Sequence, residues 1–255
     1  MAKENLYVPE IFWDERALKH GDLGDGYFNS DFQNYEDKIR MKKAFEIIGD
    51  ISGLRILDVG CGSGRWSIQM AKLGANVTAL DISREMIKLA KERAAKSNIN
   101  NIIFSNEKLE DLNYFNCFDL IIGVTVFQHV TDERRLNLAV ANAIKGLKKG
   151  GKIIIIESAP IKLGKRVFSE NGTSIMKLRP RTEWIALFER NGVKFYQSRE
   201  ICSIGRYLIR FSLKAFKNET IRSIIWRSCE FIDVNLSDKF LFCKFAKPTL
   251  FMFKK

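Results

Sequence analysis

The segment RILDVGCGSGRWSIQMAKLGANVTALDIS, residues 55–83, constrains the fold of this chain more than any other. The apolar run at its start is bounded by turn residues, which is the pattern of a strand buried on both faces. Closely spaced glycines follow where the strand should become a helix, and a second apolar run ends at Asp81. The segment therefore predicts a β-α-β unit with a glycine-rich turn at the carboxyl end of its first strand.

The rest of the chain continues this alternation of strands and helices. Helical patterns are expected at residues 35–48 and 180–190 and along an apolar stripe near residues 136–147, and Ser83 is expected to cap a helix. Five further runs have the pattern of strands, the third of them entered through a turn: NIIFSN, CFDLIIGVTVF, KKGGKIIIIES, VKFYQSREI and PTLFMFKK. We expect an α/β fold with a doubly wound, mostly parallel sheet.

The spacing of the glycines distinguishes between kinds of nucleotide-binding loop. A dinucleotide loop reads G-x-G-x-x-G, whereas the third glycine here, Gly64, comes one residue early. No Gly-Lys-Ser/Thr follows, so the segment is not a Walker loop. Asp58 stands at the strand end, where a carboxylate suits an ammonium group better than a pyrophosphate. Asp81 stands where an acid can bind both hydroxyls of a ribose. Together these residues favour S-adenosylmethionine (SAM).

Over roughly residues 40–200 the chain resembles the class I SAM-dependent methyltransferases. The resemblance rests on five segments in the order typical of that family: ILDVGCGSGRWS, VTALDIS, FDLIIGVTVFQHVTD, LKKGGKIIIIES and RTEWIALFERNGV. It implies a seven-stranded sheet whose last strand is antiparallel, with SAM lying over the carboxyl ends of the strands. The product formed from the cofactor would be S-adenosylhomocysteine.

The resemblance also implies roles for individual residues in binding the cofactor. Asp58 is expected to hold the amino group and Asp81 the ribose hydroxyls. Arg65 is expected to face the cofactor carboxylate, with a surface salt bridge as the alternative. The other contacts are expected at Gly60, Cys61, Gly62 and Gly64 beside the methionine part, at Ile82 beside the adenine and at Val124 through its backbone.

One departure from the family pattern concerns the adenine. Many members have an acid after the third strand, in a Gly-Asp-Ala-like segment, to accept a hydrogen bond from the adenine amino group. This chain has Lys108 there, followed by Leu109, and a lysine side chain cannot accept a hydrogen bond. We expect the backbone of these two residues to bind the adenine, with Glu107 or Glu110 as alternatives.

His129, just past the fourth strand, is the candidate catalytic base. Imidazole has an ordinary pKa of about 6.5, which suits general-base chemistry near neutrality. The alternative is that His129 caps the next helix or packs against a lid. Gln128 and Glu157 stand at strand ends where they could orient the acceptor. The chain lacks the Asn/Asp-Pro-Pro-Tyr motif of amino methylation on DNA or glutamine, so an oxygen or nitrogen of another acceptor is expected.

Charge points to the kind of acceptor. The formal net charge is +12, yet residues 1–37 contain nine acidic against three basic side chains. Residues 160–255 contain twenty basic and eight acidic ones, which favours an anionic partner or a solubilising surface. Arg166 and Arg179, in the loop after the fifth strand, are candidate anion contacts. Tyr27 is a candidate acceptor contact in an N-terminal lid made mobile by glycines.

Composition excludes several classes of protein. Hydrophobic residues make up 46% of the chain, no apolar run approaches the roughly 20 residues of a membrane span, and the N-terminal segment has no secretory apolar core. We expect a cytoplasmic protein with no integral membrane part. Two histidines and five cysteines without a C-x-x-C pair give no candidate metal site.

These observations predict one SAM-binding domain over residues 1–255. Residues 1–50 would form the lid segment, 51–160 the SAM-binding core, and 161–255 the acceptor loop, the last strands and a basic helical insertion. The stretch 203–233 within this last part is compatible with a membrane surface or with a helix lying on the core.

The function expected first is methyl transfer to a small, anionic acceptor, such as a phosphate-bearing or nucleotide-linked sugar or another cell-surface precursor. Methylation of RNA or of a protein N-terminus is one alternative, although no usual RNA-binding module is present in the sequence. A SAM-binding protein without turnover is the other.

Overall fold

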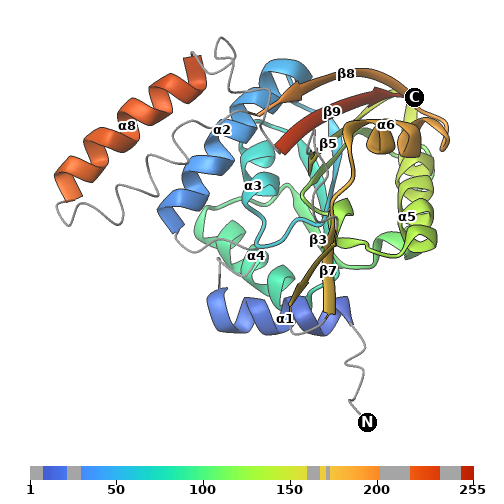
Figure 1. Ribbon diagram of the computed structural model, residues 1–255, viewed down its shortest axis with the longest axis horizontal. Helices are drawn as coiled ribbons and strands as arrows, with labels where there is room; N and C mark the ends of the chain where they lie inside the picture. The colour runs from blue at the N-terminus through green and yellow to red at the C-terminus, as the bar shows by residue number, and fades with distance from the viewer. Residues whose placement is uncertain (1–7, 22–29, 160–166, 171–172, 202–218, 236–247) are drawn as a thin grey trace.

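A seven-stranded sheet forms the centre of the molecule, with helices on both of its faces (Figure 1). The computed structural model describes residues 8–21, 30–159, 167–170, 173–201, 219–235 and 248–255. The strand order is β3-β2-β1-β4-β5-β9-β8. These strands are β1 (Arg55–Val59), β2 (Asn76–Asp81), β3 (Ile102–Asn106), β4 (Phe118–Val124), β5 (Leu147–Ser158), β8 (Lys194–Glu200) and β9 (Pro248–Lys254).

The pairing of the strands confirms the predicted fold class. β1 runs parallel to β2 and to β4, β2 to β3, and β4 to β5. β9, the last strand, is antiparallel to both of its neighbours, β5 and β8. The chain moves outward from β1 to β3 on one side and then adds β4 and β5 on the other. The direction of winding therefore reverses between β1 and β4.

Alternating side chains of the central strands build a separate apolar core on each face of the sheet. In β5, Ile154 and Ile156 belong to one core, whereas Ile153 and Ile155 belong to the other. Because both faces are buried, the strand is a continuous apolar run in the sequence. The first core is covered by α2 (Ser30–Ile48), α3 (Arg65–Lys72) and α4 (Arg84–Lys96), and the second by α5 (Glu133–Gly146) and α6 (Arg181–Glu189).

Two more helices pack on this inner layer (Figure 1). α1 (Pro9–His20) contacts α4, and α8 (Glu219–Asn235) contacts α2. In the second contact the hydroxyl of Tyr35 donates to the carboxylate of Asp233. Cys229 of α8 is buried and belongs to the first core, so the described part of the stretch 203–233 packs against α2. Residues 202–218 lie outside the described residues.

Polar capping residues determine where two helices begin beside the sheet. The hydroxyl of Ser83 accepts a hydrogen bond from the amide of Met86 at 3.1 Å, so the predicted cap of α4 is confirmed. Asp132 caps α5 in the same way, by accepting from the amide of Arg135 at 2.8 Å. Both helices therefore begin directly after the carboxyl end of a strand or its turn, where a ligand site can form.

Two details differ from the sequence-based expectation. The KKGG segment is part of β5, which begins at Leu147, because Leu147 already pairs with Phe118 of β4. The expected loop after β5 contains a two-stranded sheet, β6 (Val167–Glu170) paired with β7 (Thr173–Lys177). The Asn-Gly dipeptide between these strands is a strong signal for a hairpin.

Gly60 is the position where the turn after β1 meets the turn after β4. Its φ angle is 68°, in the left-handed region that favours glycine. A Cβ atom on Gly60 would lie 2.3 Å from Cγ2 of Val126. Only a glycine therefore allows the two turns to approach this closely.

Replacing Gly60 by alanine should lower the free energy of unfolding by about 3 kcal/mol, through left-handed strain and overpacking against Val126. Gly53→Ala is the matched control, because Gly53 has a φ of 75° but no described atom within 4 Å of an added Cβ. The control should lose only the strain, about 1–2 kcal/mol. Urea unfolding measures both, and equal losses would contradict a role for the Val126 contact.

Candidate cofactor and acceptor site

A cavity lies at the carboxyl ends of β1, β2 and β4, where the direction of winding reverses. In doubly wound sheets this crevice is the usual ligand site. Its wall contains most of the residues predicted for the site: Asp58, Gly60, Cys61, Gly62, Arg65, Asp81, Ile82, Leu109, Val124 and His129. The predicted residues that do not line it are Gly64, Lys108, Gln128, Glu157 and Arg179. Tyr27 and Arg166 lie outside the described residues.

Asp58 is a buried carboxylate at the end of β1, only 2% exposed. Burial raises its pKa to about 7, and the nearby charge of Asp81 adds to this, while a hydrogen bond from the Ser67 hydroxyl opposes it. A carboxyl group that is ready to ionise near neutrality, at the wall of a cavity, suits a cationic ligand group.

Asp81 is held in place by the backbone of two turns. Its Oδ2 accepts from the amide of Gly62 at 2.8 Å, and its Oδ1 accepts from the amide of Ser83 at 2.9 Å. An ionised carboxylate can accept about four hydrogen bonds. The carboxylate of Asp81 is thus held at the cavity wall, where an acid can bind the hydroxyls of a ribose.

The third glycine of the turn differs from the other two. Gly60 and Gly62 line the cavity, but a Cβ on Gly64 would meet the Cβ of Ala90 in α4 at 2.9 Å. Gly64 therefore permits close packing of the turn on α4. The thiol of Cys61 does line the cavity, and burial raises its pKa well above the ordinary value, so this thiol is neutral.

The cavity wall includes a second arginine that the sequence analysis did not identify. Arg40 of α2 is 4% exposed and lines the cavity together with Arg65. Arg65 forms an ion pair with Asp37 at 2.6 Å, and Arg40 pairs with Glu36 at 3.3 Å. Two guanidinium groups on one side of the cavity suit the carboxylate of an amino acid. No motif in the sequence marks Arg40, because only the packing of α2 on the sheet brings this residue to the cavity.

The end of the cavity where the adenine is expected has apolar and acidic residues. Ile82, Leu109 and Met86 line it, as does Glu107. The side chain of Lys108 points elsewhere, since its ammonium group pairs with Glu10 of α1. Lys108 thus fastens α1 to the loop after β3. A backbone contact of Lys108 with the adenine stays a prediction.

α1 closes the cavity from above the strand ends. Trp13 lines the cavity, and its ring lies edge-on to the ring of His129 at 5.0 Å between centroids. The carboxylate of Asp14 accepts from the Ser83 hydroxyl at 2.6 Å and from the amide of Glu85 at 3.1 Å. The predicted lid therefore includes a helix anchored directly beside Asp81.

His129 stands in a short 3₁₀ turn, η3 (Phe127–His129), whose start is held by a buried carboxylate. Glu157 accepts from the amides of Val126, Phe127 and Gln128 at 3.1, 2.9 and 3.3 Å. Burial raises the pKa of Glu157 to about 8, although these amide bonds favour its ionised form. Glu157 therefore supports the turn from behind and does not reach the cavity.

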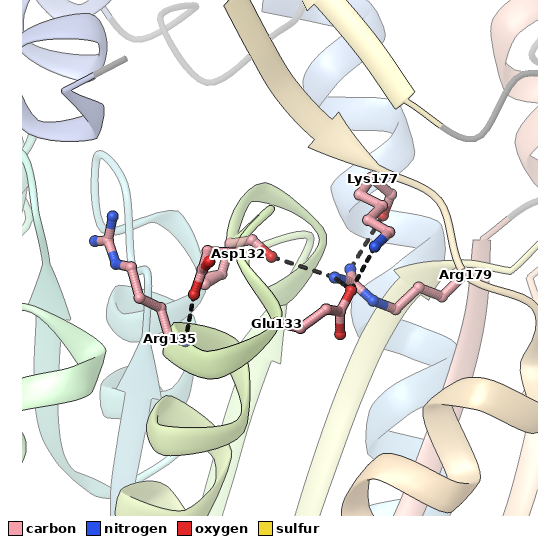
Figure 2. Close-up of polar contacts among 6 residues, drawn as sticks. Asp132, Glu133, Arg135, Lys177 and Arg179 are labelled. Atoms are coloured by element: carbon pink, nitrogen blue, oxygen red, sulfur yellow. Dashed lines mark hydrogen bonds and ion pairs between the residues drawn. The ribbon is translucent and has the colours of Figure 1, made fainter. Parts of the chain in front are cut away.

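Gln128 and Arg179 also hold the protein together instead of facing the cavity. The side-chain oxygen of Gln128 accepts from the amide of Ser158 at 3.1 Å. Arg179 pairs with Glu133 at the start of α5, and Glu133 also pairs with Lys177 (Figure 2). The expectation that Gln128, Glu157 and Arg179 contact the acceptor is therefore not supported by their placement.

Backbone strain marks the same turn. Thr125 has a φ of 53°, which is rare for a β-branched residue. It lines the cavity and its amide donates to the carbonyl of Ile156 at 2.8 Å. Strained residues persist where neighbouring contacts determine the conformation, and they concentrate at functional sites.

A comparison with protein families agrees with this geometry. Residues 50–187 match the family model of the methyltransferase domain. The chain belongs to this methyltransferase family. Its fold is that of the class I SAM-dependent enzymes, and its cofactor is SAM.

The comparisons with individual proteins give the same family. The chain is 36% identical over 108 residues to a ubiquinone biosynthesis O-methyltransferase from Xanthomonas oryzae pv. oryzae, covering 42% of this chain and 44% of the relative. It is 29% identical over 195 residues to the protein of that name from Pelagibacter ubique, covering 75% and 76%. The match thus spans less than half of the Xanthomonas relative.

A solved structure shows the same fold over nearly the whole chain. Magnesium protoporphyrin IX methyltransferase from Synechocystis PCC 6803, crystallised with S-adenosylhomocysteine, superposes with a TM-score of 0.63 at 17% identity. The superposition covers 96% of this chain and 97% of that one.

The residues on the cavity wall fit SAM. A Cβ would fill the cradle at Gly60, and carboxylates stand at the ends of β1 and β2 for an ammonium group and a ribose. The indole Nε1 of Trp66 is buried and has no hydrogen-bond partner among the described residues, and Trp66 also lines the cavity. This donor is available to a bound ligand.

In the described part of the chain, no group of three or more His, Cys, Asp and Glu residues is arranged to hold a metal ion. None of the described helices has the length and apolar character needed to cross a bilayer.

The affinity for S-adenosylhomocysteine should rise about fivefold to tenfold from pH 6.0 to 7.5, because the pKa of Asp58 lies near 7 and its ionised form binds the ligand ammonium. The ligand amino group stays largely protonated over this range. Titration calorimetry measures the affinity. Asp58→Asn should bind more weakly and lose the pH dependence, and an unchanged profile in this variant would contradict the assignment.

Arg40→Met should weaken binding of S-adenosylhomocysteine by about tenfold to a hundredfold, through loss of a charge-assisted contact with the carboxylate. Binding of 5′-methylthioadenosine, which lacks the amino-acid part, should change less than about twofold. Calorimetry with both ligands tests this. Equal losses for the two ligands would show that Arg40 supports the cavity without binding the carboxylate.

Proposed function

We propose that this protein transfers the methyl group of SAM to an oxygen of a small polar acceptor, with His129 as general base. The observation that carries the proposal is the position of His129. It lines the cofactor cavity at the end of β4, in a strained and well-supported turn beneath Trp13 of the lid. The relatives named above as O-methyltransferases favour oxygen over nitrogen as the acceptor atom.

The chain's own residues carry out two tasks in this reaction. SAM supplies an electrophilic methyl carbon when bound. Asp58 holds the ammonium group of the cofactor and Asp81 holds its ribose, which together fix its orientation over the strands. The acceptor then lies between the cofactor and the turn at Val126–His129, so that its oxygen is aligned for an in-line displacement.

His129 removes the acceptor proton. A neutral imidazole accepts this proton as the oxygen is methylated, and releases it to solvent afterwards. Trp13 covers the imidazole and excludes water from one side of it. The lid and the base are therefore in direct contact, so closing of the lid is linked to proton removal by His129.

Arg135, and not Arg166 or Arg179, supports an anionic acceptor. Arg166 lies outside the described residues and Arg179 faces the protein interior, so neither supports it. Arg135 lines the cavity, is 45% exposed and pairs with Glu110 at 2.5 Å. A phosphate or carboxylate of the acceptor would replace Glu110 at this guanidinium. Phosphate-bearing or nucleotide-linked sugars carry such a group.

An assay with methyl-labelled SAM tests the proposal. We expect label in small molecules of a metabolite extract, lost after phosphatase treatment, and none in an RNA fraction. His129→Gln should reduce transfer by about 10²- to 10⁴-fold with cofactor affinity unchanged. His20→Gln, at the exposed end of α1, is the matched control and should be fully active. Label in RNA, or full activity of His129→Gln, would overturn the corresponding part of the proposal.

A further inference from the structure

Arg179 is a buried cation that contacts residues in four parts of the chain. Its side chain is 3% exposed. Its guanidinium donates to the carboxylate of Glu133 at 2.8 Å, to the carbonyl of Val130 at 3.4 Å and to the carbonyl of Lys177 at 3.3 Å. It also lies over the ring of Trp184, 5.3 Å from its centre. A desolvated guanidinium requires such partners, and each of them is positioned in return.

The contact with Val130 lies next to His129. Figure 2 shows the guanidinium directed toward the start of α5, between β7 and the segment that leads out of η3. The start of η3 is held by Glu157, through three backbone amides. The segment after it is held by Arg179, through the carbonyl of Val130. His129 is therefore the residue between two buried anchors.

We propose that Arg179 is a positioning residue for His129. By fixing the carbonyl of Val130, the residue after His129, its guanidinium sets the direction of the imidazole toward the acceptor. The same guanidinium connects this turn to Lys177 of β7 and to Trp184 of α6. The catalytic consequence rests on the proposed role of His129, whereas the geometric claim does not.

The chain offers a favourable test, because its two histidines are His20 and His129. In protein labelled with ¹³C-histidine the imidazole spectrum has two sets of signals, and His129→Gln assigns them. Arg179→Met should displace or split the His129 signals and leave those of His20 unchanged. Hydrogen exchange at the amides of residues 129–130 should accelerate by about tenfold or more.

Lys177→Met is the matched control. It removes the other cation of Glu133 but leaves the contact of Arg179 with Val130. The His129 signals should stay as in the unaltered protein. If Arg179→Met does not fold, Arg179→Lys replaces it, because lysine keeps the charge but lacks the planar fork that reaches Glu133 and Val130 together. This variant should also displace the His129 signals.

Unchanged His129 signals in a folded Arg179 variant would overturn the inference, as would an equal displacement in Lys177→Met. The outcome is separable from that of the proposed function. If His129→Gln transfers methyl groups normally while the Arg179 variants displace His129, the proposed base is wrong and the positioning contact stands.

Discussion

The contact between the turn after β1 and the turn after β4 determines where everything else in the site lies. Neighbouring strands are about 4.8 Å apart, and at the reversal of winding their turns lead to opposite faces of the sheet. A crevice opens between them, and its floor is the backbone of Gly60 against Val126. Any side chain at Gly60 would occupy the crevice. The carboxylates of Asp58 and Asp81 enter it from adjacent strands because parallel strands end at one edge.

Polar residues at these strand ends form two groups: some line the cavity, and others support the turn that carries His129. Asp58 lines the cavity, and Asp81 does so while accepting amide bonds from the turns beside it. Glu157 and Arg179 are buried and satisfy the backbone of the turn that carries His129. The first amides of a short turn have no backbone partner within it, so a buried side chain supplies one. The precision of the cavity wall therefore depends on charged residues that no ligand touches.

The lid joins the two halves of the cavity. Asp14 binds the start of α4 beside the ribose end, whereas Trp13 contacts His129 at the acceptor end. Both residues lie in one turn of α1, so a single helix contacts both ends of the cavity. Lys108, in the place where the family often has an acid, serves this closure through Glu10. The departure from the family pattern thus has a structural use in the lid.

What the sequence by itself determined is local and periodic. The apolar runs determined the strands, their continuity showed burial on both faces, and the spacing of Asp58, Gly60 and Asp81 indicated the cofactor. These features follow from backbone geometry and from the position of parallel strand ends, and both can be read from consecutive residues.

Only the tertiary structure decided the roles of Arg40 and Arg179. Arg40 is a buried charge on a helix without a motif, and Arg179 appears in the sequence as one of several basic loop residues. The fold brings Arg40 to the cavity with α2, and it brings Arg179 to Val130 and Glu133, which are far away in the chain. The charge of a side chain specifies what it can bind but not which neighbours the fold gives it.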